Sequence, residues 1–330
     1  MHKKISILML LAMMSAADAA LFPLPAPDID VVGSLVLMNT EYEDTFVSLG
    51  QTHGLGYEEL ISANPGVDPW LPGERTEILL PKLFVLPDAP RDGIVLNLAE
   101  MRMYFYREEQ GQATVQTFPV SVGRIDRDTP TGRTEVVDKV RNPTWYPPQS
   151  IIDEKAEMGE TLPRVVPPGE DNPLGKFAMQ LGIRGYLIHG TNRPAGIGMR
   201  VTHGCIRLLP ADIERLFDQV PRGTAVHIVN QPYKMGWVGD TLFLEVHRPF
   251  ADDNTHVERG MTAIVELYVR ATRERKALID WDVVQQVYEQ AHGIPVPVSG
   301  EMAAASARMS GWCAANAAVP LCRTTVSSAQ

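Results

Sequence analysis

The chain has 330 residues, of which 45% are hydrophobic and 21% are charged; this is an ordinary globular composition and a length typical of about two domains. Its formal net charge is −10 at pH 7, and no long basic block relieves it. Because phosphate binding needs clustered Lys and Arg, these features argue against nucleic acid as a partner.

The N-terminus has the pattern of an export signal. Two lysines precede an apolar run over residues 5–14, and Ala17 and Ala19 are the small residues that a signal peptidase recognises. The run is shorter than the roughly 20 apolar residues of a membrane-spanning helix. We therefore predict a signal peptide at 1–19, cleaved near Ala19, with an uncleaved anchor as the alternative.

Residues 34–82 are predicted to form a small α+β unit. The expected elements are a strand at 34–38, helices at 44–53 and 57–63, and a strand at 77–81. Asp44 is the expected first-turn residue of the first helix, and Asn64-Pro65-Gly66 stops the second. This order resembles the LysM module, a glycan-binding fold, although Glu43-Asp44-Thr45 replaces the usual Gly-Asp-Thr. The resemblance implies glycan binding; the alternative is a unit that only supports the next domain.

Residues 92–230 are predicted to be mainly β. The expected elements are strands at 93–98, 101–106, 118–122, 134–140, 176–181, 186–189 and 225–230, and one short helix at 210–220. Residues 141–175 interrupt this pattern with a long, irregular stretch that is rich in proline. Such a stretch inside a compact domain is usually functional, which predicts a lid.

Beyond residue 231 the apolar spacing becomes helical, at 261–273 and 281–292. The tail contains Cys313 and Cys322. In an oxidising compartment this pair predicts a small disulfide loop, with two free cysteines as the alternative. Pairing them leaves Cys205 as a lone thiol, which is a candidate reactive residue.

The residues around Cys205 suggest nucleophilic catalysis. A thiol attacks as its thiolate, and a neighbouring imidazole can take the proton. His189 ends an expected strand, and His203 would share a face with the thiol on a strand but not on a turn. Gly204 permits a tight turn whose N–H groups can form an oxyanion hole. A buried structural cysteine is one alternative. A zinc site is another, but it lacks a fourth ligand and any CxxC or HExxH spacing.

The run from His189 to Leu208 resembles the signature of the L,D-transpeptidase catalytic domain, also called the YkuD domain. That signature is His, a gap, Ser or Thr, then His-Gly-Cys, an apolar residue, and Asn or Arg; Thr202 and Arg207 fill the variable positions. Further matching pieces are Asn97-Leu98-Ala99-Glu100, Gly123-Arg124, Thr129-Pro130-Thr131-Gly132, Asn142-Pro143-Thr144-Trp145 and Asn172-Pro173-Leu174-Gly175. With the LysM-like unit ahead, the arrangement is similar to the periplasmic ErfK/YbiS subgroup of Gram-negative bacteria.

The resemblance implies a mainly β catalytic domain at 92–230, a YkuD-like β-sandwich with a short helix. A helical C-terminal extension would follow at 231–330. The resemblance implies that Cys205 is the nucleophile and that His189 transfers protons, oriented by the Gly190 carbonyl. Backbone N–H groups of His203, Gly204 and Cys205 would form the oxyanion hole. The residues implied to bind substrate are Arg207, Thr202 and Trp145.

The implied activity is acyl transfer on peptidoglycan stem peptides in the periplasm, without a metal or an organic cofactor. The donor would be a tetrapeptide that loses D-Ala. The acceptor would be a diaminopimelate amine or the Lys of an outer-membrane lipoprotein. An L,D-carboxypeptidase, with water as acceptor, and a non-catalytic glycan-binding scaffold are the alternatives.

Overall fold

The structure is a computed structural model that describes residues 20–24, 29–250, 260–300 and 322–324, with Ala20 and the last three as backbone alone. The predicted signal peptide at 1–19 and the predicted Cys313–Cys322 disulfide lie outside the described side chains. Within the described ranges, no helix is long and apolar enough to cross a bilayer.

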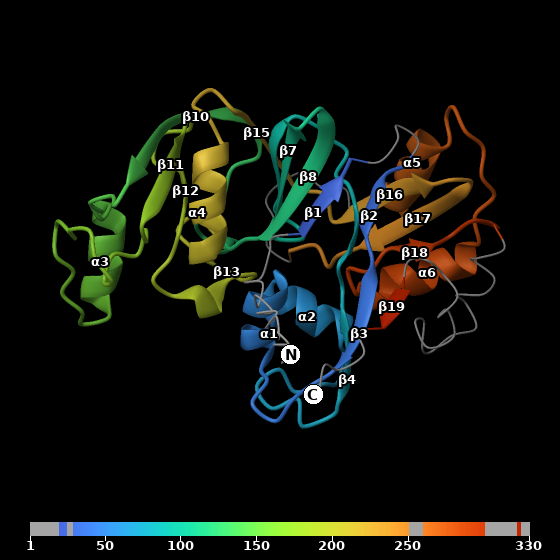
Figure 1. The fold of residues 1–330 in the computed structure, drawn as a ribbon, viewed down its shortest axis with the longest axis horizontal. Helices are drawn as coiled ribbons and strands as arrows, with labels where there is room; N and C mark the ends of the chain where they lie inside the picture. The colour runs from blue at the N-terminus through green and yellow to red at the C-terminus, as the bar shows by residue number, and fades with distance from the viewer. Residues whose placement is uncertain (1–19, 25–28, 251–259, 301–321, 325–330) are drawn as a thin grey trace, which may run out of the picture.

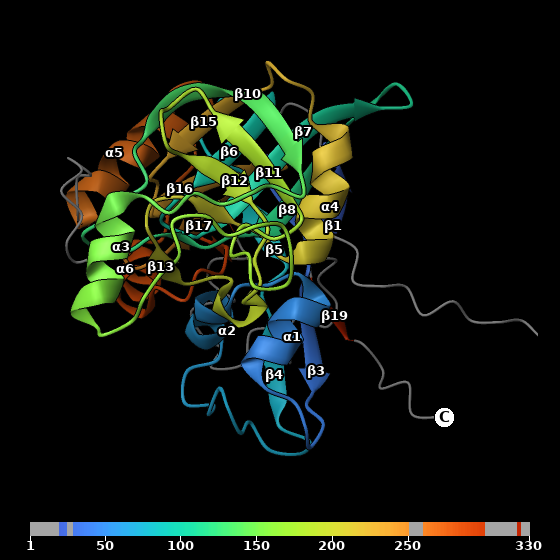
Figure 2. The same ribbon diagram turned by 90° about the vertical axis from the view of Figure 1, so that its left-hand side faces the viewer.

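The N-terminal elements form the βααβ unit (residues 35–80), the lowest part of the molecule in Figures 1 and 2. Its elements are β3 (Leu35–Asn39), α1 (Phe46–His53), α2 (Tyr57–Ala63) and β4 (Glu77–Leu80), and β3 pairs antiparallel with β4. The predicted order of elements is confirmed. The prediction for Asp44 was wrong, because Thr45 caps α1 by accepting the Ser48 N–H at 3.0 Å and no acidic residue lies in the first turn.

The central domain (residues 93–229) is built on one nine-stranded sheet, in the order β1-β8-β7-β6-β15-β10-β11-β12-β14. These strands are β1 (Ala20–Pro23), β6 (Gly93–Asn97), β7 (Arg102–Glu109), β8 (Gln112–Pro119), β10 (Gly132–Arg141), β11 (Phe177–Leu181), β12 (Leu187–His189), β14 (Ile206–Arg207) and β15 (Ala225–Val229). The first half of β10 pairs with β15 and its second half pairs with β11, with a register shift between Val136 and Asp138 in the β11 pairing.

A single apolar core holds the two halves of this sheet together. It contains Ile94 and Phe105 from one half, and Met179 and Ile188 from the other. Helix α4 (Pro210–Gln219) packs Leu216 into the same core and lies against β11. The domain is therefore mainly β with few helices, as predicted.

Two predictions within the central domain were wrong. The strand expected at 118–122 is β8, which begins at Gln112 and forms a hairpin with β7; Gln112–Gln116 is too polar to stand out as a strand. Residues 122–123 form a separate short strand, β9 (Val122–Gly123), paired with β13 (Arg200–Thr202). The α3 segment (residues 141–175) is not irregular throughout, because it contains α3 (Gln149–Glu157).

The C-terminal unit (residues 233–246 and 260–300) is not only helical. It has a three-stranded sheet of β16 (Tyr233–Val238), β17 (Thr241–Val246) and β18 (Val296–Pro297), packed against α5 (Met261–Ala271) and α6 (Trp281–Gln290). The helical prediction missed the β16–β17 hairpin, which turns at the positive-φ Gly239. The remaining elements are β2 (Val31–Gly33), β5 (Leu83–Val85), the 3-10 helix η1 (Pro194–Gly196) and β19 (Cys322–Thr324).

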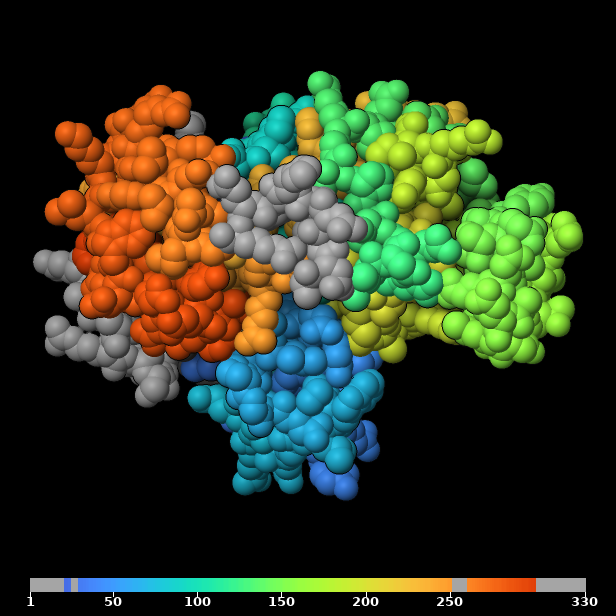
Figure 3. All heavy atoms as spheres, turned by 180° about the vertical axis from the view of Figure 1, so that it is seen from behind, coloured from blue at the N-terminus to red at the C-terminus, as the bar shows by residue number. Residues whose placement is uncertain are grey.

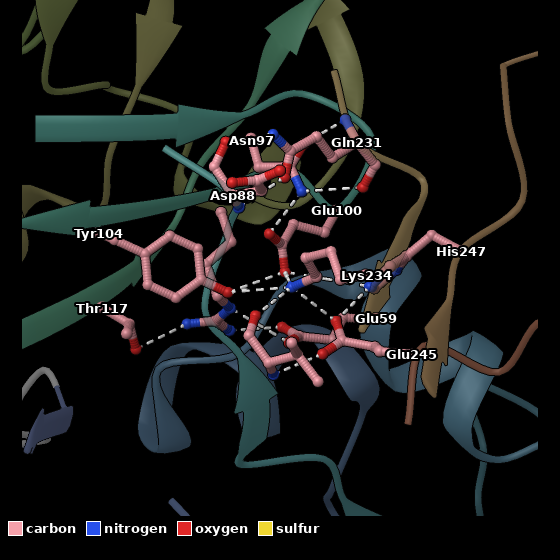
Figure 4. Close-up of polar contacts among 12 residues, drawn as sticks. Glu59, Asp88, Asn97, Glu100, Tyr104, Thr117, Gln231, Lys234, Glu245 and His247 are labelled. Carbon is pink, nitrogen blue, oxygen red and sulfur yellow. Dashed lines mark hydrogen bonds and ion pairs between the residues drawn. The ribbon is translucent and has the colours of Figure 1, made fainter. Parts of the chain in front are cut away.

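A buried ionic cluster joins the central domain to the C-terminal unit (Figure 4). The Lys234 ammonium lies 2.7 Å from Glu100, 2.8 Å from Glu245 and 2.7 Å from the Val85 carbonyl. Glu100, Glu245 and His247 are close enough together to bind a metal ion. Because the lysine already supplies the positive charge between the two carboxylates, the chemistry of this cluster does not call for a metal.

Candidate active site

Two short parallel strands place the predicted histidine and cysteine on one face. In the pairing of β12 with β14, Ile188 lies opposite Ile206 and His189 lies opposite Arg207. Both isoleucines point into the core, so His189 and Arg207 point the other way. Cys205 directly precedes β14 and is two residues before Arg207, so it shares their face. The backbone of Cys205 therefore lies diagonally across from His189, at the start of the neighbouring strand.

The imidazole of His189 is buried and its orientation is fixed. Its Nδ1 lies 2.6 Å from the carbonyl oxygen of Gly190. A carbonyl only accepts hydrogen bonds, so Nδ1 carries the proton and the neutral ring keeps its lone pair on Nε2. Burial and the charge of Arg207 lower the pKa of His189 to about 3, although hydrogen bonding to the backbone of Gly190 and Leu174 acts to raise it. His189 is therefore a neutral proton acceptor at physiological pH.

The thiol of Cys205 is half-buried, and its sulfur lies 3.7 Å from the Gly185 carbonyl. Burial raises the thiol pKa, whereas the Leu187 backbone and the positive charge of Arg207 act in the opposite direction. With a raised thiol pKa and a lowered imidazole pKa, the resting pair is thiol and neutral imidazole rather than thiolate and imidazolium. Proton transfer then accompanies attack on a substrate.

Arg207 is held by its main chain, while its side chain has unused hydrogen-bonding capacity. Its N–H and C=O both pair with Ser121 at 3.0 Å. Burial lowers the pKa of the guanidinium, and its Nε is buried without a hydrogen-bond partner. An unpaired buried donor on a cation is costly, so a carboxylate is a suitable ligand for it.

Thr202 braces the loop that carries the thiol. Its hydroxyl donates to the Cys205 carbonyl at 2.6 Å and accepts the Gly204 N–H at 3.1 Å, and its side chain is buried. Two predictions are corrected here. Thr202 is buried rather than at a substrate-accessible surface, and the Gly204 N–H, which was predicted for the oxyanion hole, already donates to the Thr202 hydroxyl. Thr129, from a different part of the chain, stabilises the same turn by donating its hydroxyl to the Gly204 carbonyl at 2.8 Å.

His203 does not share a strand face with Cys205, because the chain bends at residues 203–204. Its Nε2 instead contacts Glu154 of α3, which also binds Arg124. Sequence reasoning missed both Glu154, the partner of His203, and Arg124, which binds Glu154. A usable indication was present for α3: Gln149–Glu157 contains no proline or glycine, although the surrounding segment is rich in both.

The α3 segment is anchored beside Gly190. Buried Asn172 donates to the Pro143 carbonyl at 2.8 Å. Gly175 has φ +67, and a side chain there would come within 2.9 Å of the Thr191 nitrogen. Trp145 lies in the same segment, where its backbone pairs with Val166. The substrate contact of Trp145 stays a prediction.

The βααβ unit docks on the loop between His189 and Cys205. The Tyr57 and Glu58 N–H groups, at the start of α2, donate to the carbonyls of Ile197 and Gly198 at 3.2 and 3.3 Å. At Gly198, a Cβ would overlap the backbone of Gly56. The first turn of a helix has N–H groups without partners in the helix, and this loop satisfies two of them.

Comparisons with known proteins point to one family. The family "L,D-transpeptidase catalytic domain" (YkuD) matches residues 91–228. The chain is 37% identical to the "Probable L,D-transpeptidase ErfK/SrfK" of Salmonella typhimurium, over 84% of this chain and 91% of that protein. It is 38% identical to YcfS of Escherichia coli, over 86% and 89% of the two chains, and 36% identical to E. coli YbiS, over 86% and 93%.

Proposed function

Because the chain belongs to the L,D-transpeptidase family, we propose that it is a peptidoglycan L,D-transpeptidase with Cys205 as nucleophile and His189 as base. The observation that supports this assignment is the parallel register of β12 and β14, in which Cys205 lies diagonal to His189, together with the Gly190 carbonyl contact that leaves the lone pair of the neutral ring on Nε2. A nucleophile, a base and a group that orients the base form the general arrangement of covalent acyl transfer.

In the first step the sulfur of Cys205 attacks the carbonyl carbon at the L-centre of diaminopimelate in a tetrapeptide, and the thiol proton passes to Nε2 of His189. The bond to D-Ala then breaks, and His189 returns the proton to the leaving amine. The products are a thioester on Cys205 and free D-Ala. The N–H groups of His203 and Cys205 would stabilise the oxyanion, and Arg207 would bind a carboxylate of the stem peptide.

In the second step an amine attacks the thioester, and its proton returns through His189 to the thiol. A diaminopimelate side-chain amine gives a 3→3 cross-link, and the C-terminal Lys of an outer-membrane lipoprotein gives wall anchorage. Water in the same position would make the protein an L,D-carboxypeptidase. This substrate class places the protein in the periplasm, in agreement with the predicted signal peptide.

The βααβ unit is proposed to bind the glycan of the same wall. The side chains of Tyr42, Trp70 and Leu71 are 82%, 58% and 77% exposed, in the β3–α1 and α2–β4 loops. The ring of Trp70 also packs beside Tyr57. Exposed aromatic rings supply apolar contact area for the faces of sugars. Weaker sedimentation of W70A with insoluble peptidoglycan would support this assignment, and unchanged sedimentation would contradict it.

The test of the enzyme is mass spectrometry of the full chain with a disaccharide-tetrapeptide, with and without a lipoprotein C-terminal peptide, beside C205A. Release of D-Ala with a cross-linked dimer or a linked peptide, absent in C205A, establishes transpeptidation and identifies the acceptor. Release of D-Ala with tripeptide alone identifies a carboxypeptidase. Folded protein that forms neither adduct nor product would leave the glycan-binding scaffold as the function.

A further inference from the structure

The catalytic loop is the connection from β12 to β14 (residues 190–205), and the α3 segment reaches it through one carboxylate. Glu154 projects from α3, and its Oε2 lies 3.0 Å from Nε2 of His203. The same carboxylate accepts two hydrogen bonds from Arg124, at 2.8 and 2.7 Å. Figure 3 shows the light-green α3 segment as a lobe at the edge of the molecule, so this contact ties a projecting segment to the loop next to the nucleophile.

Arg124 is placed to hold this carboxylate. Its backbone N–H donates to the Thr202 carbonyl at 3.0 Å, which fixes it against the catalytic loop. Asp126 accepts from the guanidinium at 2.8 and 3.2 Å and orients it. The side chains of Glu154 and His203 are only 17% and 25% exposed, so water screens the contact less than on an open surface.

The contact sets the proton position on His203. A carboxylate only accepts hydrogen bonds, so Nε2 of His203 carries the proton and Nδ1 keeps the lone pair when the ring is neutral. The hydrogen bonds from Arg124 and His203 lower the pKa of Glu154 to about 2, which keeps it ionised at neutral pH. His203 and His189 are therefore held in opposite tautomers by two different acceptors.

We propose that Glu154 is a positioning residue for the reaction: it holds the His203 side chain, and through it the His203–Cys205 backbone, in the geometry that acyl transfer needs. This inference rests on the proposed function, because the geometry matters for acyl transfer only if Cys205 is the nucleophile. It also assigns a role to the α3 segment, which would hold the catalytic loop in place through Glu154. Small displacements of a reacting group can cost up to about 100-fold in rate, so a positioning contact should show in kcat.

The decisive experiment is a double-mutant cycle on cross-linking kinetics with E154A, H203A and E154A/H203A. D153N is the matched control, because Asp153 is the exposed neighbour whose side chain bonds only Gln149 among the described residues. We expect E154A to lower kcat roughly 10-fold with less than about 3-fold change in KM. We expect E154Q, which keeps an acceptor for His203, to recover part of this loss, and D153N to match the wild type.

If Glu154 acts through His203, E154A causes no further loss in the H203A background. Equal losses in both backgrounds, or a change in KM or melting temperature alone, would overturn the proposal. A second measurement needs no substrate: in proton NMR, the Nε2–H of His203 should resonate downfield in the wild type and in D153N, because it donates to a carboxylate, and it should lose this downfield shift in E154A. An unchanged Nε2–H signal in E154A overturns the proposal, whereas a wild-type protein that forms no product counts against the proposed function instead.

Discussion

Arg207 lies opposite His189 in the parallel pairing of β14 with β12, and its charge acts on the imidazole and on the thiol of Cys205. It lowers the pKa of both groups. The same cation therefore disfavours the imidazolium and favours the thiolate. Arg207 thus influences the protonation of both His189 and Cys205 without exchanging a proton itself.

The first prediction concerns thiol reactivity. Alkylation of Cys205 by iodoacetamide, followed by mass spectrometry, should rise with pH and have its midpoint above that of an ordinary thiol, because burial raises the pKa. R207M should move the midpoint higher still. R222M is the control, since Arg222 is an exposed residue paired with Asp138. An unchanged midpoint in R207M would show that the charge of Arg207 does not reach the thiol.

The second prediction concerns stability against acid. The pKa of His189 is about 3 in the folded state and about 6.5 in the unfolded chain. The unfolded chain binds the proton first, so stability is lost as the pH falls from 6.5 toward 3. Between pH 7 and 4.5, urea unfolding should show that the wild type loses roughly 2–3 kcal/mol more than H189N. Equal losses would mean that His189 takes up its proton in the folded state.

The third prediction concerns the buried cluster. K234M leaves Glu100 and Glu245 buried without their shared cation, and it should lower the free energy of unfolding by roughly 3–5 kcal/mol. K155M removes a solvent-exposed pair with Glu160 and should cost no more than about 1 kcal/mol. Urea denaturation of both variants provides the comparison. Similar small losses would mean that the two glutamates are protonated or hydrated without the lysine.

The fourth prediction concerns the docking of the βααβ unit. Gly198 and Gly223 both have positive φ, but a Cβ overlaps the Gly56 backbone only at Gly198 and meets nothing within 4 Å at Gly223. G223A should cost about 1–2 kcal/mol for its backbone conformation alone. G198A should cost roughly 1–3 kcal/mol more and also lower cross-linking activity, because it separates α2 from the catalytic loop. Equal unfolding energies would show that the interface can open without cost.

The sequence predicted most where the pattern is local. The helix at Tyr57–Ala63 follows from apolar spacing and the Asn64-Pro65-Gly66 stop, and both of its ends were located correctly. The β16–β17 hairpin was missed because its strands carry no strict alternation of apolar and polar residues. The candidate catalytic residues could be proposed from the sequence because they occupy one short run from His189 to Arg207.

Contacts between distant residues leave no such pattern. Glu154 and His203 are 49 residues apart, and neither the spacing nor the composition of α3 indicates what its carboxylate meets. The side-chain hydroxyl of Thr202 likewise gave no sign in the sequence that it folds back onto its own loop. Both contacts, Glu154 with His203 and Thr202 with Cys205, form only after the α3 segment has packed and the chain has bent at Gly204.

The hydrogen bonds from Tyr57 and Glu58 to Ile197 and Gly198 have a geometric consequence for the whole molecule. The start of α2 meets the loop that joins His189 to Cys205 through main-chain atoms, so the contact does not depend on the conformation of a flexible side chain. If the βααβ unit binds glycan, as proposed, the bound segment would lie at a set distance from the thiol while this interface is closed. The interface would then determine how far along the polymer from the bound segment the reaction takes place.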